Sequence, residues 1–227
     1  MRCVVSSPTL TDKVAKDICQ DILSGELKPN QKLVVSELKQ KYNVGASPIR
    51  EALIQLSWIK YVKLEPQKGC WVAPISKAEL YDLHESLNVV ASVLLEKSIK
   101  EGSENWELSI LTEFHKLSRF KFQAESFDWQ EWEARQEAFY LALFSGCFSK
   151  NMQEFLHDII RQIKRYRQIS LNYSPRGFDE TFRLDEHEKI MKLTLDKDLD
   201  AAKLQLSDFI TAMIKEIEPQ VDAIEMA

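Results

Sequence analysis

The sequence has few of the features that mark secreted and membrane-spanning proteins. It contains four cysteines, which are far apart and occur in neither CxxC nor CxxH spacing, so we expect a reducing compartment. No apolar run approaches the roughly 20 residues that a membrane span needs. The first residues also lack the apolar core of a signal peptide. We therefore expect a cytoplasmic protein with no membrane partner.

Charge is unevenly distributed along the 227 residues, of which 44% are hydrophobic, enough to fill one large core or two modest ones. Residues 1–75 contain 11 Lys and Arg against 7 Asp and Glu, a net charge of +4. Residues 76–227 contain 19 against 28, a net charge of −9. This asymmetry indicates a small module that can approach polyanions, joined to an acidic one that cannot. Chance clustering of charges on solvated faces is the alternative.

A helix with a well-marked start is predicted from residue 47 onward. Ser47 can act as its N-cap, and Pro48 suits a first helical position that needs no N–H donor. Apolar residues then recur at i, i+3, i+4 and i+7 and form one face: Ile49, Ala52, Leu53 and Leu56. The remaining positions offer short polar groups and one arginine: Ser47, Arg50, Glu51 and Gln55.

Two further helices are predicted ahead of this one. The first begins at Thr11 and ends at the Ser24-Gly25 stop, and the second is capped by Ser36 and buries Leu38. A turn over residues 43–45 then leads into the third helix, as in a helix-turn-helix.

A β-hairpin is predicted after the third helix. Residues 62–65 and 70–73 alternate between apolar and polar side chains, and residues 66–69 between them have turn chemistry. Three helices followed by a hairpin predict a winged helix. In such a fold the third helix enters the major groove of DNA, and the hairpin reaches the neighbouring backbone or minor groove.

Three ordered motifs resemble the winged-helix domain of the GntR family of bacterial transcription regulators. They are the segments 22–29, 47–53 and 67–72. The resemblance implies that Arg50 contacts DNA, that Ser47 stands where a family threonine touches phosphate, and that Gly69 lets the wing backbone approach the groove. We add Lys68 as a wing contact to phosphate.

The sequence also departs from the family pattern at three expected DNA-binding positions. The family commonly has serine and arginine where this chain has Gly45 and Ala46, and an arginine where it has Ser36. Because one good bidentate base contact provides about 1–3 kcal/mol of discrimination, we expect a different operator or weaker readout. Gln55, on the polar side of the third helix, completes the predicted DNA-binding set.

The rest of the chain is predicted to be an all-helical bundle. A capping box at Ser76 to Glu79 opens a long helix, and we place the boundary between the two domains there, at residues 1–75 and 76–227. Helices are expected over six ranges, with apolar stripes and short connections: 76–100, 103–123, 128–145, 149–171, 178–195 and 198–222. Their order and lengths resemble the FCD domain of the FadR-type subfamily. The fold class is therefore mainly α.

The resemblance to FCD domains implies four positions that often hold a divalent metal beside a carboxylate effector. In this chain they are Gln136, Tyr140, His187 and Phe209, and the position of a frequent effector-binding arginine is Leu87. One matching ligand of four predicts no metal and no cofactor. We hypothesise a metal-free pocket lined by these five residues and suited to a less charged ligand. The alternative is a filled cavity that binds no small molecule.

The function expected from these observations is transcription regulation by a sequence-specific, DNA-binding homodimer that acts as a repressor. The dimer predicts a pseudo-palindromic operator in double-stranded DNA, and the bundle would sense a small-molecule effector. A winged-helix interaction protein is the alternative, and an enzyme is not expected because the carboxylate-histidine pairs of a helical metalloenzyme are missing. A basic cluster at Arg161, Lys164, Arg165 and Arg167 is expected to form a solvated face or a dimer contact.

Overall fold

The structure, a computed structural model, describes residues 9–120, 129–173 and 184–225. The chain divides into two compact units, each described below within those residues. The first comprises Met1–Tyr81, Ile160–Gly177 and Ile217–Ala227, and the second comprises Asp82–Ile159 and Phe178–Glu216.

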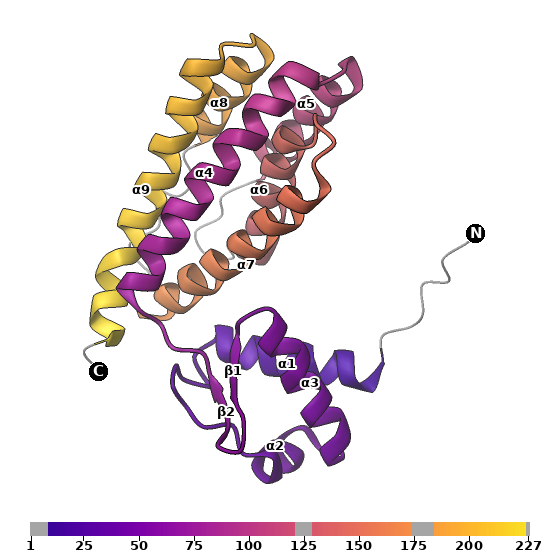
Figure 1. The fold of residues 1–227 in the computed structure, drawn as a ribbon, viewed down its shortest axis with the longest axis vertical. Helices are drawn as coiled ribbons and strands as arrows, with labels where there is room; N and C mark the ends of the chain where they lie inside the picture. The colour runs from indigo at the N-terminus through magenta and orange to yellow at the C-terminus, as the bar shows by residue number, and fades with distance from the viewer. Residues whose placement is uncertain (1–8, 121–128, 174–183, 226–227) are drawn as a thin grey trace. The chain divides into compact units, whose positions relative to one another are not determined.

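The first unit contains the predicted winged helix (Figure 1). Its elements are the helices α1 (Leu10–Leu23), α2 (Val35–Tyr42) and α3 (Ala46–Trp58), followed by the strands β1 (Val62–Glu65) and β2 (Gly69–Val72). The apolar stripes of the three helices share one core with the hairpin, as the 3.6-residue and two-residue periods predict. The core includes Ile18, Ile22, Ile49, Leu53 and Val72, each at most 3% exposed.

The predicted starts of the three helices are wrong by one to two residues. Helix α1 begins at Leu10, where Thr9 and Asp12 form a reciprocal capping box. Ser36 and Ser47 are not caps, because the N-caps of α2 and α3 are Val34 and Gly45, and neither makes a side-chain cap hydrogen bond.

The turn between α2 and α3 explains the early start of α3. Asn43 ends α2 in the left-handed region at φ 53° and ψ 47°, a conformation that asparagine tolerates well. Gly45 is extended, at φ −67° and ψ 167°, so the helix begins at Ala46. Pro48 then lies in the first turn, where its missing N–H leaves no helical hydrogen bond unmade.

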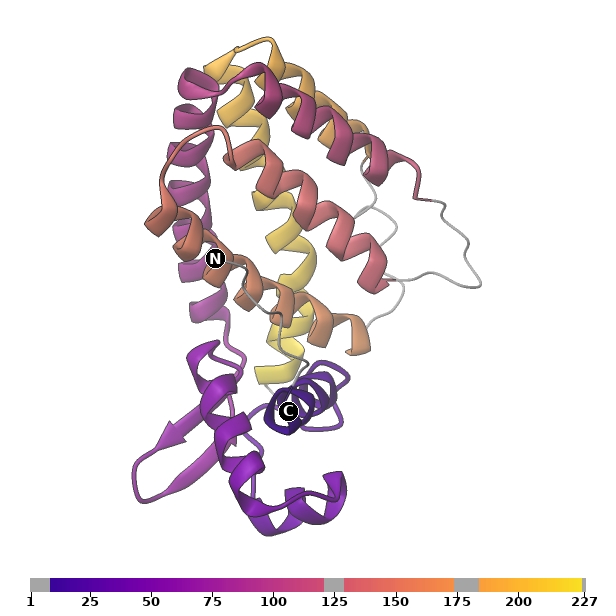
Figure 2. The same cartoon turned by 90° about the vertical axis from the view of Figure 1, so that its right-hand side faces the viewer.

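The hairpin is antiparallel, and its register pairs Val62 with Val72 and Glu65 with Gly69. A short bridge from Lys32 to Trp71 adds the loop before α2 to the outer side of β2. Two hydrogen bonds fix this bridge: Leu33 N–H donates to the Cys70 carbonyl (2.8 Å), and Val72 N–H donates to the Gln31 carbonyl (2.9 Å). The wing is thereby held against the same core as α3, and Figure 2 shows the two elements side by side.

The start of α4 (Lys77–Glu101) is fixed by two buried side chains of α7 (Lys150–Tyr173). Arg165, 1% exposed, donates to the carbonyls of Ala73 (3.2 Å) and Pro74 (3.1 Å) and pairs with the Glu79 carboxylate (3.3 Å). The Tyr166 hydroxyl donates to the same carboxylate. Burial raises the pKa of Tyr166, so this hydroxyl stays protonated and able to donate.

These contacts correct two predictions from the sequence. Glu79 does not close a capping box: Ser76 accepts from the Glu79 N–H (3.2 Å), but the Ser76 N–H donates to Tyr166 (3.1 Å). The basic cluster on α7 is also not a solvated face, since Arg165 and Arg167 are 1% and 6% exposed. The carbonyls and the carboxylate that accept from Arg165 lie far away in sequence, so helical spacing could not reveal them.

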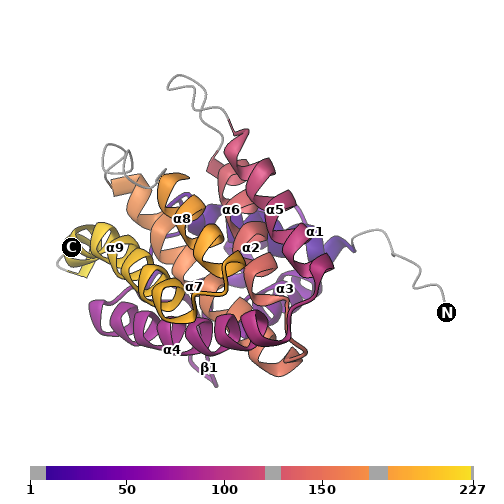
Figure 3. The ribbon, with the colours of Figure 1, turned by 90° about the horizontal axis from the view of Figure 1, so that it is seen from above.

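The second unit is helical, as predicted. It contains most of α4, the first part of α7 and most of α9 (Leu199–Glu225), with α5 (Glu104–Ser118), α6 (Trp129–Phe144) and α8 (Leu184–Leu195). Figure 3 shows α4 and α9 side by side, where Lys203 pairs with Glu96 at 2.6 Å and His84 contacts Thr211 at 3.2 Å.

One predicted helix is shorter than expected, and the start of another is not described. Helix α5 ends at Ser118 with Arg119 as C-cap, and not at residue 123. Residues 121–123 and the expected start of the next-to-last helix at residues 178–183 lie outside the described residues. Within the described ranges, no helix is long and apolar enough to cross a membrane.

Candidate nucleic-acid interface and ligand site

One face of α3 is buried and the opposite face is open. Ile49 and Ala52 are fully buried, and Leu53 and Leu56 are each 3% exposed. The exposed side chains follow one helical stripe: Ser47, Arg50, Glu51, Ile54 and Trp58. The Glu51 carboxylate at the edge of this stripe accepts a hydrogen bond from the Thr11 hydroxyl at 2.9 Å. The sequence predicted the buried face and identified Ser47 and Arg50 on the open one. It missed Ile54, which is 41% exposed.

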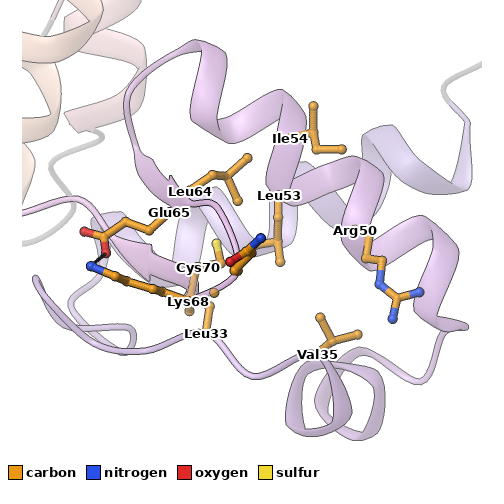
Figure 4. Close-up of a pocket in the computed structure, with 11 residues that line it drawn as sticks. Leu33, Val35, Arg50, Leu53, Ile54, Leu64, Glu65, Lys68 and Cys70 are labelled. Atoms are coloured by element: carbon orange, nitrogen blue, oxygen red, sulfur yellow. Dashed lines mark ion pairs between the residues drawn. The ribbon is translucent and has the colours of Figure 1, made fainter.

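A groove of about 530 Å³ separates this face of α3 from the hairpin. Its lining is apolar along the middle and charged at its two sides. Figure 4 shows Arg50 on one side and the Glu65–Lys68 pair on the other, with Leu53, Leu64 and Cys70 between them. Three of the predicted DNA-binding residues line this groove: Arg50, Lys68 and Gly69.

The wing lysine is held loosely. Lys68 lies 3.6 Å from the Glu65 carboxylate and its side chain is 75% exposed, whereas Lys63 lies 2.9 Å from the same carboxylate. The hydrogen bond from Lys63 is the main reason that the pKa of Glu65 is lowered, and Lys68 contributes less. An exposed ion pair of this kind is weak. Lys68 can therefore contact a phosphate while the ion pair between Lys63 and Glu65 stays intact.

The tip of the wing requires unusual backbone conformations. Gln67 has φ 62° and Gly69 has φ 130°. A side chain with a Cβ rarely adopts the second value, so glycine at position 69 has a conformational reason. The Lys68 N–H closes the turn by donating to the Glu65 carbonyl at 3.1 Å.

The remaining predicted DNA-binding residues lie at helix starts or face another helix. Ser36 is the second residue of α2, and Gly45 and Ala46 are the N-cap and first residue of α3. Gln55 turns toward α1, where its amide donates to Asp12 at 3.3 Å. The structure therefore brings Arg50, Lys68 and Gly69 together in one groove, and it does not bring Gln55 to them.

Four of the five predicted effector-site residues lie together in the helical unit. His187 is fully buried, and its Nε2 lies 3.1 Å from the Gln136 amide nitrogen. Its ring centroid is 5.5 Å from that of Tyr140 and 4.9 Å from that of Phe209. Phe139 lies 5.7 Å from the same imidazole and was not predicted. Such separations are those of packed aromatic pairs.

Leu87, the fifth predicted effector residue, is buried on α4 at 6% exposure. Among the residues that the structure describes, no three His, Cys, Asp or Glu side chains cluster as metal ligands do. The donor set at the four family positions is one imidazole, one amide, one phenol and one phenyl ring. This set has no carboxylate, which hard divalent ions prefer, and only one imidazole, which transition metals prefer, so it does not fit a metal ion.

Comparisons with known proteins agree with the fold. The sequence model described as "Bacterial regulatory proteins, gntR family" matches residues 10–72, and that of the FCD domain matches residues 104–212. The HTH-type transcriptional repressor GlaR of Escherichia coli (strain K12) is 31% identical over 175 residues, 77% of this chain and 79% of GlaR. The chain belongs to the gntR family of bacterial regulatory proteins. It has the FadR-type architecture of a GntR domain followed by an FCD domain.

Other GntR relatives extend the comparison. The uncharacterized HTH-type regulator BphR of Paraburkholderia xenovorans (strain LB400) is 29% identical over 153 residues, which cover 66% of this chain and 62% of BphR. The structure of E. coli McbR/YncC superposes with a TM-score of 0.71 at 17% identity, over 93% of this chain and 98% of that one. This structural likeness shows the fold. As a GntR-family member, the chain is a DNA-binding transcription regulator.

Proposed function

We propose that this GntR regulator reads its operator with the open face of α3 and the tip of the wing. Arg50 donates to base edges in the major groove, the usual role of an arginine there. Ser47 lies in the first turn of α3, where its hydroxyl and the free helix N–H groups can meet phosphate. Lys68 and Gly69 contact the neighbouring backbone. The observation that carries this proposal is the groove with Arg50 on one side and Lys68 on the other.

The remaining predicted positions have smaller parts in this proposal. Ser36, Gly45 and Ala46 offer short side chains or none, so they allow close approach and supply little base readout. Gln55 binds Asp12 and must leave it to reach DNA. We keep the predicted domain boundary, with residues 1–75 as the DNA-binding domain and 76–227 as the sensing and dimerisation domain.

A binding assay on the upstream DNA of the chain's own gene tests the proposal. Fluorescence polarisation over a salt series separates sequence-specific affinity from counterion release. We expect one region to be bound at least about a thousandfold more tightly than random DNA at 150 mM salt, the lower end of the usual range of specificity ratios. Equal, steeply salt-sensitive binding to both DNAs would contradict it and favour the interaction-protein alternative.

We further propose that the protein is a homodimer that binds a pseudo-palindromic operator, and that α4 forms the dimer surface. Val89 and Val93, one turn apart on α4, are 60% and 40% exposed. Two exposed apolar side chains one turn apart form an apolar stripe on the helix, and such stripes mark interaction surfaces.

Paired substitutions test the dimer surface. Val89→Glu with Val93→Glu should convert the dimer to a monomer in sedimentation velocity, because two buried carboxylates per subunit would oppose association. Leu108→Glu with Leu111→Glu on α5 is the matched control, since these side chains are 59% and 44% exposed. A dimer that survives the α4 pair, or is lost only with the α5 pair, would contradict this assignment.

For the helical domain we propose a metal-free effector site at Gln136, Tyr140, His187, Phe209 and Leu87. The hydrogen bond between Gln136 and His187 offers a neutral polar pair among aromatic rings, which suits a neutral or weakly charged ligand with an apolar part. A second candidate is a domain that binds no effector. The 4.9 Å separation of the His187 and Phe209 rings favours it, because the rings already fill space beside the polar pair.

Native mass spectrometry of the freshly purified protein distinguishes these two functions. A small molecule bound once per subunit would support the effector site, and the mass of the bare protein would support the filled one. Elemental analysis belongs to the same experiment. One tightly held divalent metal per subunit would contradict the metal-free assignment.

We propose that the protein acts as a repressor in the cytoplasm, where bacterial DNA lies. The relative GlaR is named a repressor, and a dimer on an operator can exclude the polymerase. Deleting the gene should raise transcription from the promoter that the protein binds. A fall in that transcription would identify an activator.

A further inference from the structure

An apolar side chain interrupts the DNA-facing surface of α3. Ile54 follows Arg50 by four residues, so the two side chains lie on the same helix face about 6 Å apart along the axis. Ile54 is 41% exposed, whereas the apolar residues of the buried face are at most 3% exposed. It lines the groove together with Arg50, Leu64 and Lys68 (Figure 4).

The surroundings of Ile54 indicate what it contacts. Arg50 places positive charge on one side of the groove, and on the other side the exposed Lys68 extends beside Glu65. These two cations suit contact with a nucleic-acid strand. Leu64 on β1 is likewise 43% exposed. Ile54 and Leu64 therefore do not bury each other, and both leave apolar surface exposed in the groove. An isoleucine neither donates nor accepts a hydrogen bond, so it cannot read the donors and acceptors of a base edge.

The thymine C5-methyl is the apolar group that the major groove displays, and apolar side chains recognise it by contact. We infer that Ile54 is a specificity-determining residue that reads thymine methyl groups about two base pairs from the base contacted by Arg50. This inference rests on the proposed placement of α3 in the major groove. Methyl contact by Ile54 would also replace part of the base discrimination that is lost at Gly45 and Ala46, because neither residue has a side chain that can hydrogen-bond to a base.

Replacing thymine by deoxyuridine tests the inference, because the exchange removes only the methyl group. An operator is first selected from a random duplex library with the full-length protein. Each thymine of one half-site is then replaced singly by deoxyuridine, and affinity is measured by polarisation at fixed salt. Burial of one methyl predicts about a fourfold weaker affinity at the position read by Ile54, and about sixteenfold when both half-sites are changed.

The variant Ile54→Ala should bind the thymine and deoxyuridine operators equally, while Ile54→Val, which keeps a branched apolar side chain, should retain most of the difference. Leu111→Ala, at an apolar position on α5 that is 44% exposed and so close to the 41% of Ile54, should keep the full difference. Circular dichroism of each variant checks that the fold is intact.

Two results would overturn the inference: a wild-type protein indifferent to every deoxyuridine, or an unchanged preference for thymine in Ile54→Ala. Failure of the proposed function has a different signature. In that case Arg50→Ala keeps its operator affinity, whatever the deoxyuridine series shows. If Arg50→Ala loses affinity while Ile54→Ala keeps the thymine preference, only the role of Ile54 is wrong.

Discussion

Single residues decide the shape of the wing tip. Gly69→Ala should destabilise the protein by about 1–3 kcal/mol, because φ 130° forces a residue with a Cβ into a strained region. The Cβ would also lie 3.5 Å from the Trp71 ring, an ordinary contact, so the backbone angle and not crowding is the cause. Urea unfolding followed by circular dichroism measures the change.

Gly45→Ala is the matched control for this prediction. Gly45 has φ −67°, and an added Cβ would meet only Pro48 at 3.7 Å. A residue with a Cβ adopts that angle without strain, so the free energy of unfolding should change by less than about 1 kcal/mol. An equal loss of unfolding free energy in Gly69→Ala and Gly45→Ala would show that the backbone angle at position 69 does not require glycine.

At the level of elements, the start of α4 depends on Arg165. Arg165→Met should lower the free energy of unfolding by about 2–4 kcal/mol, because the carbonyls of Ala73 and Pro74 lose their donors. Chemical denaturation measures this loss. Lys192→Met, which removes an exposed i,i+4 pair with Glu188, should change it by no more than about 0.5 kcal/mol. Similar effects of the two substitutions would contradict the role of Arg165.

The contact of α4 with α9 should weaken in acid. Hydrogen bonds from Lys100 and then Lys203 lower the pKa of Glu96 from 4.5 to about 2. The stabilisation is therefore present above pH 4.5 and is lost as the pH falls toward 2. The difference in urea midpoint between wild type and Glu96→Gln should be present at pH 7 and should vanish as Glu96 becomes protonated. A difference that is constant between pH 7 and 2 would contradict this linkage.

The elements were largely predictable from the sequence, and their contacts were not. Apolar residues that recur every 3.6 or every two residues predicted the three helices, the hairpin and the bundle, because the side of an element that is buried carries its apolar side chains. Cap positions were wrong for Ser36 and Ser47, since a serine near a helix start can cap or merely lie in the first turn. The burial of Arg165 and the turn of Gln55 toward Asp12 depend on partners distant in sequence.

Most residues of the candidate sites were predicted from the sequence, and Ile54 was not. Arg50 and Gly69 were predicted from the resemblance to the GntR family, and Lys68 was added as a wing contact. The three residues lie in one groove. Gln136, Tyr140, His187 and Phe209 were found from family positions and pack together. Ile54 was missed because an isoleucine one residue from Leu53 resembles a core position. Only its 41% exposure separates it from the buried face.

For the whole molecule, the central claim is that specific DNA recognition depends on the open face of α3. Two winged helices of a dimer would present this face to two half-sites, so a change in one side chain acts twice on the operator. Non-specific affinity depends instead on the total positive charge near phosphate. A variant that removes base readout should therefore lose specificity and keep its fold and most of its background binding.

The most direct measurement compares Arg50→Ala with wild type on the selected operator and on a scrambled duplex at one salt concentration. Loss of a bidentate contact in each half-site predicts operator binding that is weaker by about 30-fold or more, from about 1–3 kcal/mol per contact. Affinity for the scrambled duplex should fall only slightly. Lys150→Ala, which removes an equal charge from a 77% exposed side chain at the start of α7, should leave both affinities unchanged. Operator affinity retained by Arg50→Ala would contradict the account.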